Sequence, residues 1–293
     1  MNSLQTLVDA VNLGAVYALA AIGVGVIFGV MRLINFAHGE LISAAAFTAY
    51  LLEGQPVWMR VAGALTASFV MALLMERIAF RSIRKASAAT LLITSFALSY
   101  LLQHLIVLVF GARPLGVSLL PQLSESVRAG ELRIPWLELA TISSTALILG
   151  ALLLFFHRSR LGVAMRAAAE DFTMARLVGV RSDRIIAAGF GISGLLAACI
   201  GLYLVIQSGT VSYRMGVDIV LVAFVATVVG GMGSLGGAAL GGFLVGVTSI
   251  ALQAFLPESW RPYRDAFLFG LFLAFLILRP GGLMQPRHRR EWV

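Results

Sequence analysis

Nine apolar runs, separated by short polar segments, dominate this chain of 293 residues. The runs cover residues 7–31, 33–52, 57–75, 88–110, 136–156, 185–207, 217–231, 238–256 and 265–278. A helix needs about 20 apolar residues to cross a bilayer, and most of the runs come close to that length. Within lipid, a helix pairs its own backbone groups, whereas an open strand leaves them unpaired. We therefore predict an all-α polytopic membrane protein with about 8–10 transmembrane helices.

The composition excludes an ordinary soluble enzyme. Charged residues make up 12% of the chain, against roughly 25% in a typical soluble domain, and they are too few to form a polar shell. The single cysteine, Cys199, permits no internal disulfide. We expect one transmembrane domain over residues 1–293 that is surrounded by membrane lipid and has no nucleic-acid partner.

The distribution of charge predicts the orientation of the chain. The segments 32–40, 76–87, 157–184 and 279–293 together hold 15 Lys and Arg residues and six acids, whereas the rest of the chain holds seven cations and eight acids. Loops rich in Lys and Arg face the cytoplasm. We therefore expect a cytoplasmic C-terminus, a cytoplasmic loop over about 157–184 and an external loop over about 111–135. Nine crossings place the N-terminus outside, and a re-entrant segment would reverse that side.

Two apolar stretches are interrupted, one in each half of the chain. Residues 33–52 begin with an amide, an imidazole and a carboxylate (Asn35, His38 and Glu40), and residues 230–237 include five glycines. Helix breaks at membrane depth occur only where protein or water covers the exposed backbone. In transporters, paired interrupted helices point to the substrate path. We therefore predict two interrupted or re-entrant segments.

The polar groups of residues 34–40 have two interpretations. Such groups are costly in lipid unless they face a cavity, a partner or the interface, so the segment either lines a pathway or caps the next helix. Asn35 and His38 are three residues apart and can share a helical face. A metal site is not favoured, because the other three histidines lie in different segments. The candidate pathway residues of the whole chain are Asn12, Tyr17, Asn35, His38, Ser95, Gln103, Gly231 and Gly233.

The glycine-rich stretch matches G-x-G-x-x-G, which marks dinucleotide binding only between a strand and a helix. Membrane helices surround it here, so close helix packing is the better interpretation. Gly233, Gly237 and Gly241 are four residues apart, as are Gly242 and Gly246. Such spacing lets helices approach backbone to backbone, and contact between this backbone and a substrate is the alternative.

The connector over residues 157–184 differs from the other loops. Residues 164–180 are rich in Ala, Met and Arg, which favour a helix, and Gly179 suits a helix C-terminus. Such a helix would dock in a groove on another protein or lie on lipid headgroups. The acids Glu170 and Asp171 favour a protein partner, because an anionic leaflet repels them. We therefore predict a short cytoplasmic coupling helix.

The chain contains no motif that would hydrolyse a nucleotide. A phosphate-binding P-loop requires G-x-x-x-x-G-K-[ST], and the single lysine, Lys85, is followed by Ala86. The sequence also lacks H-E-x-x-H and G-x-S-x-G. We predict no catalytic residues, no metal site and no cofactor in this chain.

Three stretches of the chain carry a family resemblance. Residues 12–40 begin N-L-G-A-V-Y-A-L and end I-N-F-A-H-G-E, residues 165–180 include M-R-A-A-A-E-D and A-R-L-V-G-V, and residues 229–237 read V-G-G-M-G-S-L-G-G. Together they resemble the membrane permease subunits of bacterial branched-chain amino acid ABC importers, the Liv type. The resemblance covers residues from about 10 to 280 and implies a multi-pass protein of the bacterial inner membrane.

The resemblance also implies partners. In such importers an external binding protein delivers the amino acid, two permease subunits form the path, and two cytoplasmic ATPases bind ATP and magnesium and drive transport. The second permease subunit is usually a paralogue. The family's ATPase-docking segment corresponds in this sequence to Arg166, Glu170, Asp171, Ala175, Arg176 and Gly179.

The substrate is less constrained. The spans carry few charges, so a strongly charged solute finds no counter-charge, and an apolar zwitterion or a small neutral molecule fits better. Residues 43–46 read Ser-Ala-Ala-Ala, whereas bulkier side chains are often found there in the family. Related permeases carry urea, short amides or aromatic acids. A stand-alone channel or secondary transporter is the alternative class. A membrane enzyme using His38 and Glu40 would lack any recognised catalytic arrangement.

Overall fold

The computed structural model describes residues 3–84, 86–129 and 132–284. The elements in chain order are α1 (Ser3–Met31), α2 (His38–Leu51), α3 (Val57–Leu74), the π-helix η1 (Met75–Phe80), α4 (Ala88–Phe110), β1 (Leu115–Gly116), the 3₁₀-helix η2 (Pro121–Ser124), β2 (Ser126–Ala129), β3 (Leu132–Pro135), α5 (Trp136–Arg158), α6 (Arg160–Glu170), α7 (Phe172–Leu177), α8 (Ser182–Ser208), β4 (Thr210–Val211), α9 (Met215–Gly230), α10 (Leu235–Phe255), the 3₁₀-helix η3 (Glu258–Tyr263) and α11 (Arg264–Leu278). The cations of the charge count that lie outside the described residues are Lys85, Arg287, Arg289 and Arg290.

Each of the nine apolar runs contains a helix in the described part of the chain, which confirms the predicted all-α membrane fold. Six stretches there are long and apolar enough to cross a membrane: α1, α3 with η1, α4, α5, α8 and α10. The helices α2, α9 and α11 have 14, 16 and 15 residues. At about 1.5 Å per residue they are shorter than the hydrocarbon core, which is about 30 Å thick.

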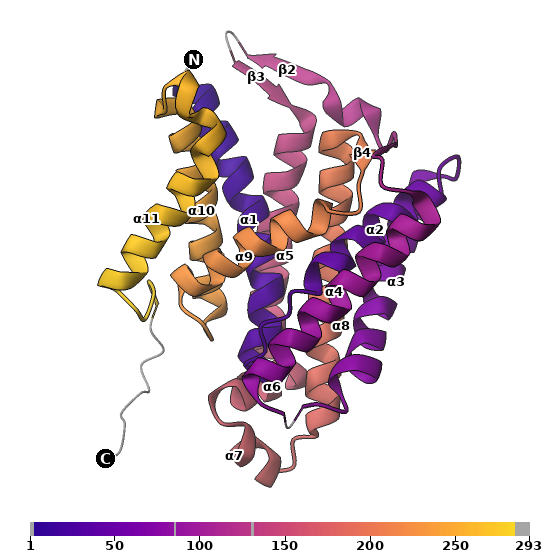
Figure 1. The fold of residues 1–293 in the computed structure, drawn as a ribbon, viewed down its shortest axis with the longest axis vertical. Helices are drawn as coiled ribbons and strands as arrows, with labels where there is room; N and C mark the ends of the chain where they lie inside the picture. The colour runs from indigo at the N-terminus through magenta and orange to yellow at the C-terminus, as the bar shows by residue number, and fades with distance from the viewer. Residues whose placement is uncertain (1–2, 85, 130–131, 285–293) are drawn as a thin grey trace.

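The long helices run between the two ends of the bundle, whereas the short helices α6 and α7 lie together at one end (Figure 1). α1 starts at the end that holds the β2–β3 hairpin and finishes at the end that holds α6 and α7. α2 begins part-way along the bundle, after the non-helical residues 32–37, and α9 crosses the middle obliquely before the break at 231–234. These two breaks are the interruptions that the sequence predicts.

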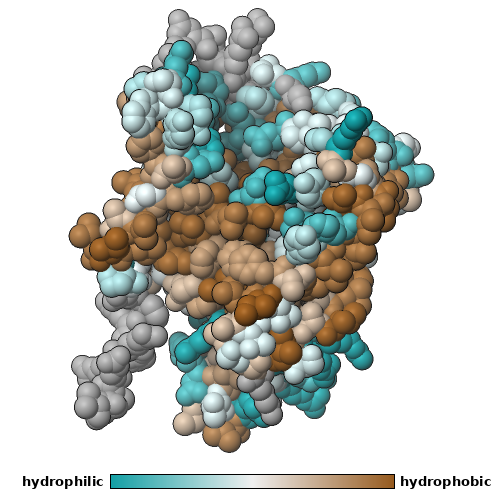
Figure 2. Space-filling view, viewed as in Figure 1, coloured by the Kyte–Doolittle hydropathy of each residue, from teal (hydrophilic) through white to brown (hydrophobic). Residues whose placement is uncertain are grey.

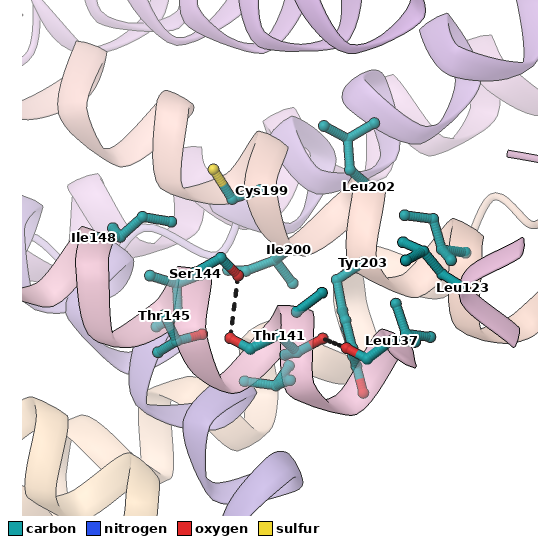
Figure 3. A pocket seen from close by; sticks show the side chains of 14 residues that line it. Leu123, Leu137, Thr141, Ser144, Thr145, Ile148, Cys199, Ile200, Leu202 and Tyr203 are labelled. Carbon is teal, nitrogen blue, oxygen red and sulfur yellow. Dashed lines mark hydrogen bonds between the residues drawn. The ribbon is translucent and has the colours of Figure 1, made fainter. Parts of the chain in front are cut away.

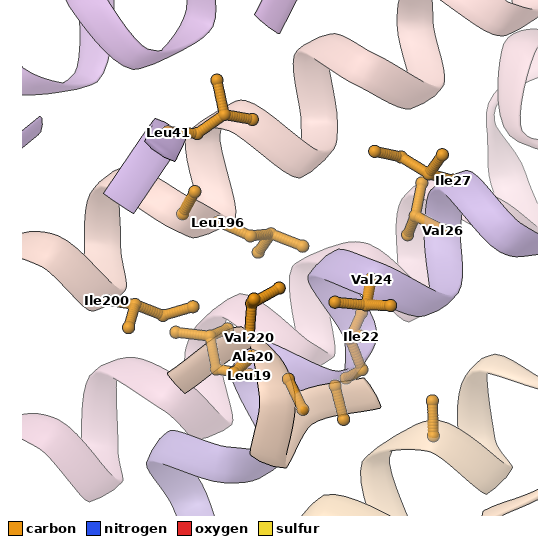
Figure 4. Close-up of a cluster of buried hydrophobic side chains, with 14 of the residues drawn as sticks. Leu19, Ala20, Ile22, Val24, Val26, Ile27, Leu41, Leu196, Ile200 and Val220 are labelled. Carbon is orange, nitrogen blue, oxygen red and sulfur yellow. The ribbon is translucent and has the colours of Figure 1, made fainter. Parts of the chain in front are cut away.

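α1 lies at the centre of the bundle and packs against α5, α8, α9 and α10. In its most apolar window, 83% of the residues are buried. Figure 4 shows Leu19 and Ile27 of α1 near Leu41 of α2, Leu196 of α8 and Val220 of α9, all of which belong to one buried cluster. Because lipid tails are as apolar as these side chains, van der Waals contact and not water exclusion favours the packing. Close fit between helices therefore matters more here than total apolar area.

The outer surface carries a wide apolar band with polar ends (Figure 2). α4 is the most exposed of the long helices, with 11% of its apolar window buried. Its outer face presents Ile93, Leu101, Leu105 and Leu108, which are 47–80% exposed. Such a face suits lipid tails or another membrane helix.

The predicted external loop over residues 111–135 contains secondary structure of its own. It contains β1, η2 and the β2–β3 hairpin, and β1 pairs with β4, so that Leu115 lies opposite Val211. Arg60 of α3 is 5% exposed and donates hydrogen bonds to the carbonyl oxygens of Ala49 at 3.0 Å and Ser118 at 2.6 Å. The loop is therefore fastened to α3 and to the segment between α8 and α9.

An ion cluster joins η1 to the start of α8 at the opposite end of the bundle. Arg84 pairs with Glu76 and, at 2.5 Å, with Asp183, while Arg81 pairs with Asp183 at 2.6 Å. Glu76 is 4% exposed. This cluster could not be predicted from the sequence, because Asp183 lies 99 residues from Arg84.

Alanine in place of Arg84 is expected to destabilise the protein by about 3–5 kcal/mol, because it leaves the buried Glu76 carboxylate without a cation. Arg77→Ala is the matched control, since Arg77 is exposed on η1 and has no ion pair among the described residues. Thermal unfolding in detergent should give a lower midpoint for Arg84→Ala alone. Equal midpoints for the two variants would contradict this role of Arg84.

Candidate functional site

Residues 32–37 turn the chain from α1 into α2. The side-chain oxygen of Asn35 accepts a hydrogen bond from the Ala37 N–H at 3.1 Å, and its carbonyl oxygen accepts one from the His38 N–H at 3.2 Å. α2 begins at His38, so Asn35 lies in the turn before the helix. The prediction that Asn35 and His38 share a helical face is therefore wrong.

His38 is fully buried and links three helices. Its Nδ1 lies 2.9 Å from the Ser193 hydroxyl of α8, which also lies 2.9 Å from the Gly23 carbonyl oxygen of α1. The hydroxyl has one proton and donates it to Gly23, so the imidazole Nδ1–H is the donor to Ser193. The other nitrogen, Nε2, has no hydrogen-bond partner, and a Cβ atom added at Gly23 would lie 2.9 Å from it. Because glycine has no Cβ atom, Gly23 leaves enough space for the His38 imidazole.

Glu40 is also fully buried and faces α4. Its Oε1 accepts hydrogen bonds from the Ser99 hydroxyl at 2.9 Å and from the Gln103 amide at 3.1 Å. The Gln103 amide also donates to the Ser99 hydroxyl at 3.0 Å. The carboxylate therefore accepts two donors from one apolar helix.

Ser95 continues this polar stripe toward the turn before α2. Its hydroxyl oxygen lies 3.3 Å from both the Phe36 N–H and the Ile34 carbonyl oxygen. Ser95, Ser99 and Gln103 follow one another at intervals of four residues, so they share one face of α4. We call the contact between this stripe and residues 34–40 the α2–α4 seam. The four-residue spacing is a sequence signal that could have identified Ser99, which the prediction missed.

A groove of about 200 Å³ lies between α1, α5 and α8 (Figure 3). Thr141 and Ser144 of α5 line one wall, and Cys199 and Tyr203 of α8 line the opposite wall. The Tyr203 hydroxyl accepts a hydrogen bond from the Asn12 amide at 3.1 Å. The groove therefore offers hydroxyl groups in apolar surroundings. Asn12 contacts one of its lining side chains, Tyr203.

The predicted pathway residues do not form a single site. Asn35, His38, Ser95 and Gln103 adjoin the start of α2. The Tyr17 backbone packs against α10, where a Cβ atom added at Gly242 would lie 2.4 Å from the Tyr17 carbonyl oxygen, and no hydrogen bond joins Tyr17 to the described residues of this turn. The α2–α4 seam thus gathers the largest share of the predicted polar residues.

Gly231 and Gly233 form the turn between α9 and α10. A Cβ atom added at Gly231 would lie 2.3 Å from the carbonyl oxygen of Met284, which follows α11. Gly233 has φ of 97°, and no atom lies within 4 Å of an added Cβ. The packing role predicted for Gly233 is therefore wrong, because a positive φ and not a close helix requires glycine there.

The packing prediction holds for the glycines inside α10. A Cβ atom added at Gly237 would lie 2.4 Å from the Gly230 carbonyl oxygen, and one added at Gly241 would lie 2.1 Å from the Ala226 carbonyl oxygen. These contacts bring α10 and α9 together backbone to backbone. The break between them is consequently a tight hairpin of two membrane helices.

Residues 160–177 form two short helices, whereas the sequence predicts one. α6 ends at Glu170, and the Asp171 carboxylate then accepts hydrogen bonds from the N–H groups of Thr173 and Met174, at 2.9 Å each. Because these N–H groups at the start of α7 need a partner, an aspartate there favours a new helix start. The Ala-rich composition around it conceals this break.

The end of α7 has the geometry that Gly179 predicts. The Gly179 N–H bonds to the Arg176 carbonyl oxygen at 3.1 Å, and the Val180 N–H bonds to the Ala175 carbonyl oxygen at 3.0 Å. Gly179 has φ of 92°. This pair of hydrogen bonds and the left-handed glycine define a Schellman motif, so the chain turns sharply between α7 and α8.

Most of the predicted coupling residues are exposed, namely Arg166, Glu170, Asp171, Arg176 and Gly179. Ala175 is 4% exposed and belongs to the inner face of α7. Three apolar side chains beside them, Met174, Leu177 and Val178, are 61–80% exposed, and we call them the α7 tip. They lie at the end of the bundle that holds α6 and α7 (Figure 1).

Most of the chain matches a known protein family. The family model described as "Branched-chain amino acid transport system / permease component" matches residues 6–276. The chain belongs to this family. It is a multi-pass membrane permease component, as the resemblance in its sequence implied.

The permease is also similar to curated relatives over almost its full length. It is 35% identical to the high-affinity branched-chain amino acid transport system permease protein BraD of Pseudomonas aeruginosa, over 96% of this chain and 95% of BraD. It is 32% identical to the permease protein LivH of the corresponding system of Escherichia coli K12, with the same coverage. The autoinducer 2 import permease LsrC of Klebsiella pneumoniae is 31% identical over 58% of this chain and 49% of LsrC.

Proposed function

We propose that this permease forms one half of the translocation path of an ATP-driven importer for branched-chain or other hydrophobic amino acids. Its full-length similarity to BraD and LivH, both named as permeases of branched-chain amino acid systems, carries the proposal. The few charges of the spans agree with a zwitterion that has an apolar side chain.

The same proposal assigns the partners and the orientation. A second permease subunit, a paralogue of this chain, completes the path. An external binding protein delivers the substrate, and two separate cytoplasmic ATPases bind ATP and magnesium. The end that holds α6, α7 and most of the described arginines faces the cytoplasm, since cationic loops stay on that side. The exposed apolar side chains of the α7 tip then meet an ATPase, because no lipid tail reaches them beyond the membrane.

Uptake of labelled L-leucine into proteoliposomes tests the proposal. The assembled transporter should accumulate leucine only with ATP and the binding protein, and this permease alone should accumulate none. Leucine entry through the purified permease alone, without nucleotide, would contradict the proposal and favour a stand-alone channel or secondary transporter. Binding of urea, short amides or aromatic acids, and not leucine, to the external binding protein would contradict the substrate assignment.

A further inference from the structure

Glu40 carries an unpaired acceptor in the interior of the membrane domain. The residue is 0% exposed. Oε1 accepts hydrogen bonds from Ser99 and Gln103, whereas Oε2 has no hydrogen-bond partner. None of the ion pairs of the described residues includes Glu40. Because a buried carboxylate needs a cation or further donors, this oxygen is available to a ligand.

Asn35 carries an unpaired donor along the same seam. Its side-chain oxygen accepts from the Ala37 N–H, which fixes the amide orientation and leaves Nδ2 with no acceptor. The residue is 3% exposed. Its neighbours Ile34 and Phe36 contact Ser95, which precedes Ser99 by one helical turn, or about 6 Å along α4. An unpaired donor and an unpaired carboxylate oxygen therefore lie beside adjacent turns of one helix.

Aromatic rings lie next to this seam. The ring of Phe36 stacks on Phe96 of α4 with 4.2 Å between centroids, and it lies 5.5 Å from the ring of Phe224 of α9. These rings provide an apolar wall beside the polar groups. The seam therefore combines an acceptor, a donor and an apolar surface, which are the three features that a zwitterion with an apolar side chain requires.

α4 covers the seam from the outside. It packs chiefly against α2 and η1, and most of its outer face is exposed. Figure 1 shows α4 crossing in front of α2 and α8. A displacement of this one helix would open the seam without disturbing the contacts of α1 with α8 and α10.

We propose that the α2–α4 seam binds the charged head of the amino acid during its passage through the membrane. Oε2 of Glu40 accepts the substrate ammonium group, the Asn35 amide donates to the substrate carboxylate, and the side chain lies against the phenylalanine rings. The assignment rests on the proposed function, because it takes an amino acid as the substrate.

Glu40→Gln in the reconstituted transporter tests the assignment. Glutamine keeps an oxygen for Ser99 and Gln103 but removes the charge, so ATP-driven L-leucine uptake should fall about tenfold or more, as expected for the loss of a charged hydrogen bond. ATP hydrolysis stimulated by the binding protein should persist. Glu53→Gln is the matched control, since Glu53 is an exposed glutamate shortly after α2, and its uptake should equal that of the wild type.

The outcomes separate this inference from the proposed function. Failure of the wild-type transporter to take up leucine contradicts the proposed function, whatever Glu40 does. Normal wild-type uptake with equal uptake by Glu40→Gln overturns the seam assignment alone. Loss of stimulated hydrolysis together with uptake would show a structural role for Glu40 and would also overturn it.

Two further measurements keep the assignment testable if Glu40→Gln folds poorly. The double variant Glu40→Gln and Gln103→Glu moves the carboxylate from α2 to α4, across the seam. It should recover part of the leucine uptake that Glu40→Gln loses. No recovery would count against the site. Replacing sodium by choline should leave wild-type uptake unchanged. Uptake that requires sodium would assign Oε2 to an inorganic cation and overturn the ammonium assignment.

Discussion

Leucine in place of Gly242 is expected to prevent the permease from folding. A Cβ atom at this position of α10 would lie 2.4 Å from the Tyr17 carbonyl oxygen and 2.5 Å from the Ala18 Cα of α1. Both contacts are with backbone, which cannot rotate away as a side chain can. The two helices would have to separate along the most extensive helix contact of the described chain. The cost in stability should exceed the value of about 1–3 kcal/mol that overpacking usually causes.

Gly150→Leu is the matched control for this prediction. Gly150 lies inside α5, is exposed, and has no atom within 4 Å of an added Cβ. Size-exclusion chromatography in detergent should give a normal yield of monodisperse protein for Gly150→Leu and almost none for Gly242→Leu. Similar yields of the two variants would show that α1 and α10 tolerate separation, against the packing that the structure places there.

The membrane helices could be predicted from the sequence because lipid imposes a simple rule on the chain. Any apolar run of sufficient length must pair its own backbone groups, so hydropathy alone located α1, α3, α4, α5, α8 and α10. The two interruptions were also predictable, because polar groups and glycines at membrane depth are rare. Glycine spacing correctly indicated the close contacts of Gly237, Gly241 and Gly242.

The site could be predicted only in part, because its contacts join distant segments. His38 was recognisable as unusual, but its partner Ser193 lies 155 residues away. Ser99 was missed although it has the four-residue spacing of the stripe on α4. The break between α6 and α7 was missed because helix propensity outweighed the capping preference of Asp171. Spacing alone also could not distinguish Gly233, which needs a positive φ, from the glycines that pack.

Aspartate in place of Leu177 is expected to abolish ATP-driven uptake while the permease still inserts and folds. Leu177 is 76% exposed at the α7 tip, so its replacement disturbs no packing within the chain. If the tip fills a pocket on an ATPase, a buried aspartate there would weaken the contact by about 2 kcal/mol or more, or roughly 30-fold in affinity. Co-purification of the ATPase and leucine uptake measure the two effects.

Leu177→Met is the matched control, because methionine keeps the apolar surface and nearly the same volume, and it should support normal uptake. Gly179→Arg and Glu170→Lys should fail as Leu177→Asp does, the first because the left-handed φ of 92° at position 179 strains any side chain. Normal uptake by Leu177→Asp, Gly179→Arg and Glu170→Lys would show that α7 does not contact the ATPase. Loss of uptake with the ATPase still bound would instead place the defect in the transmission of the ATPase's motion from α7 to the start of α8, where Asp183 pairs with Arg84.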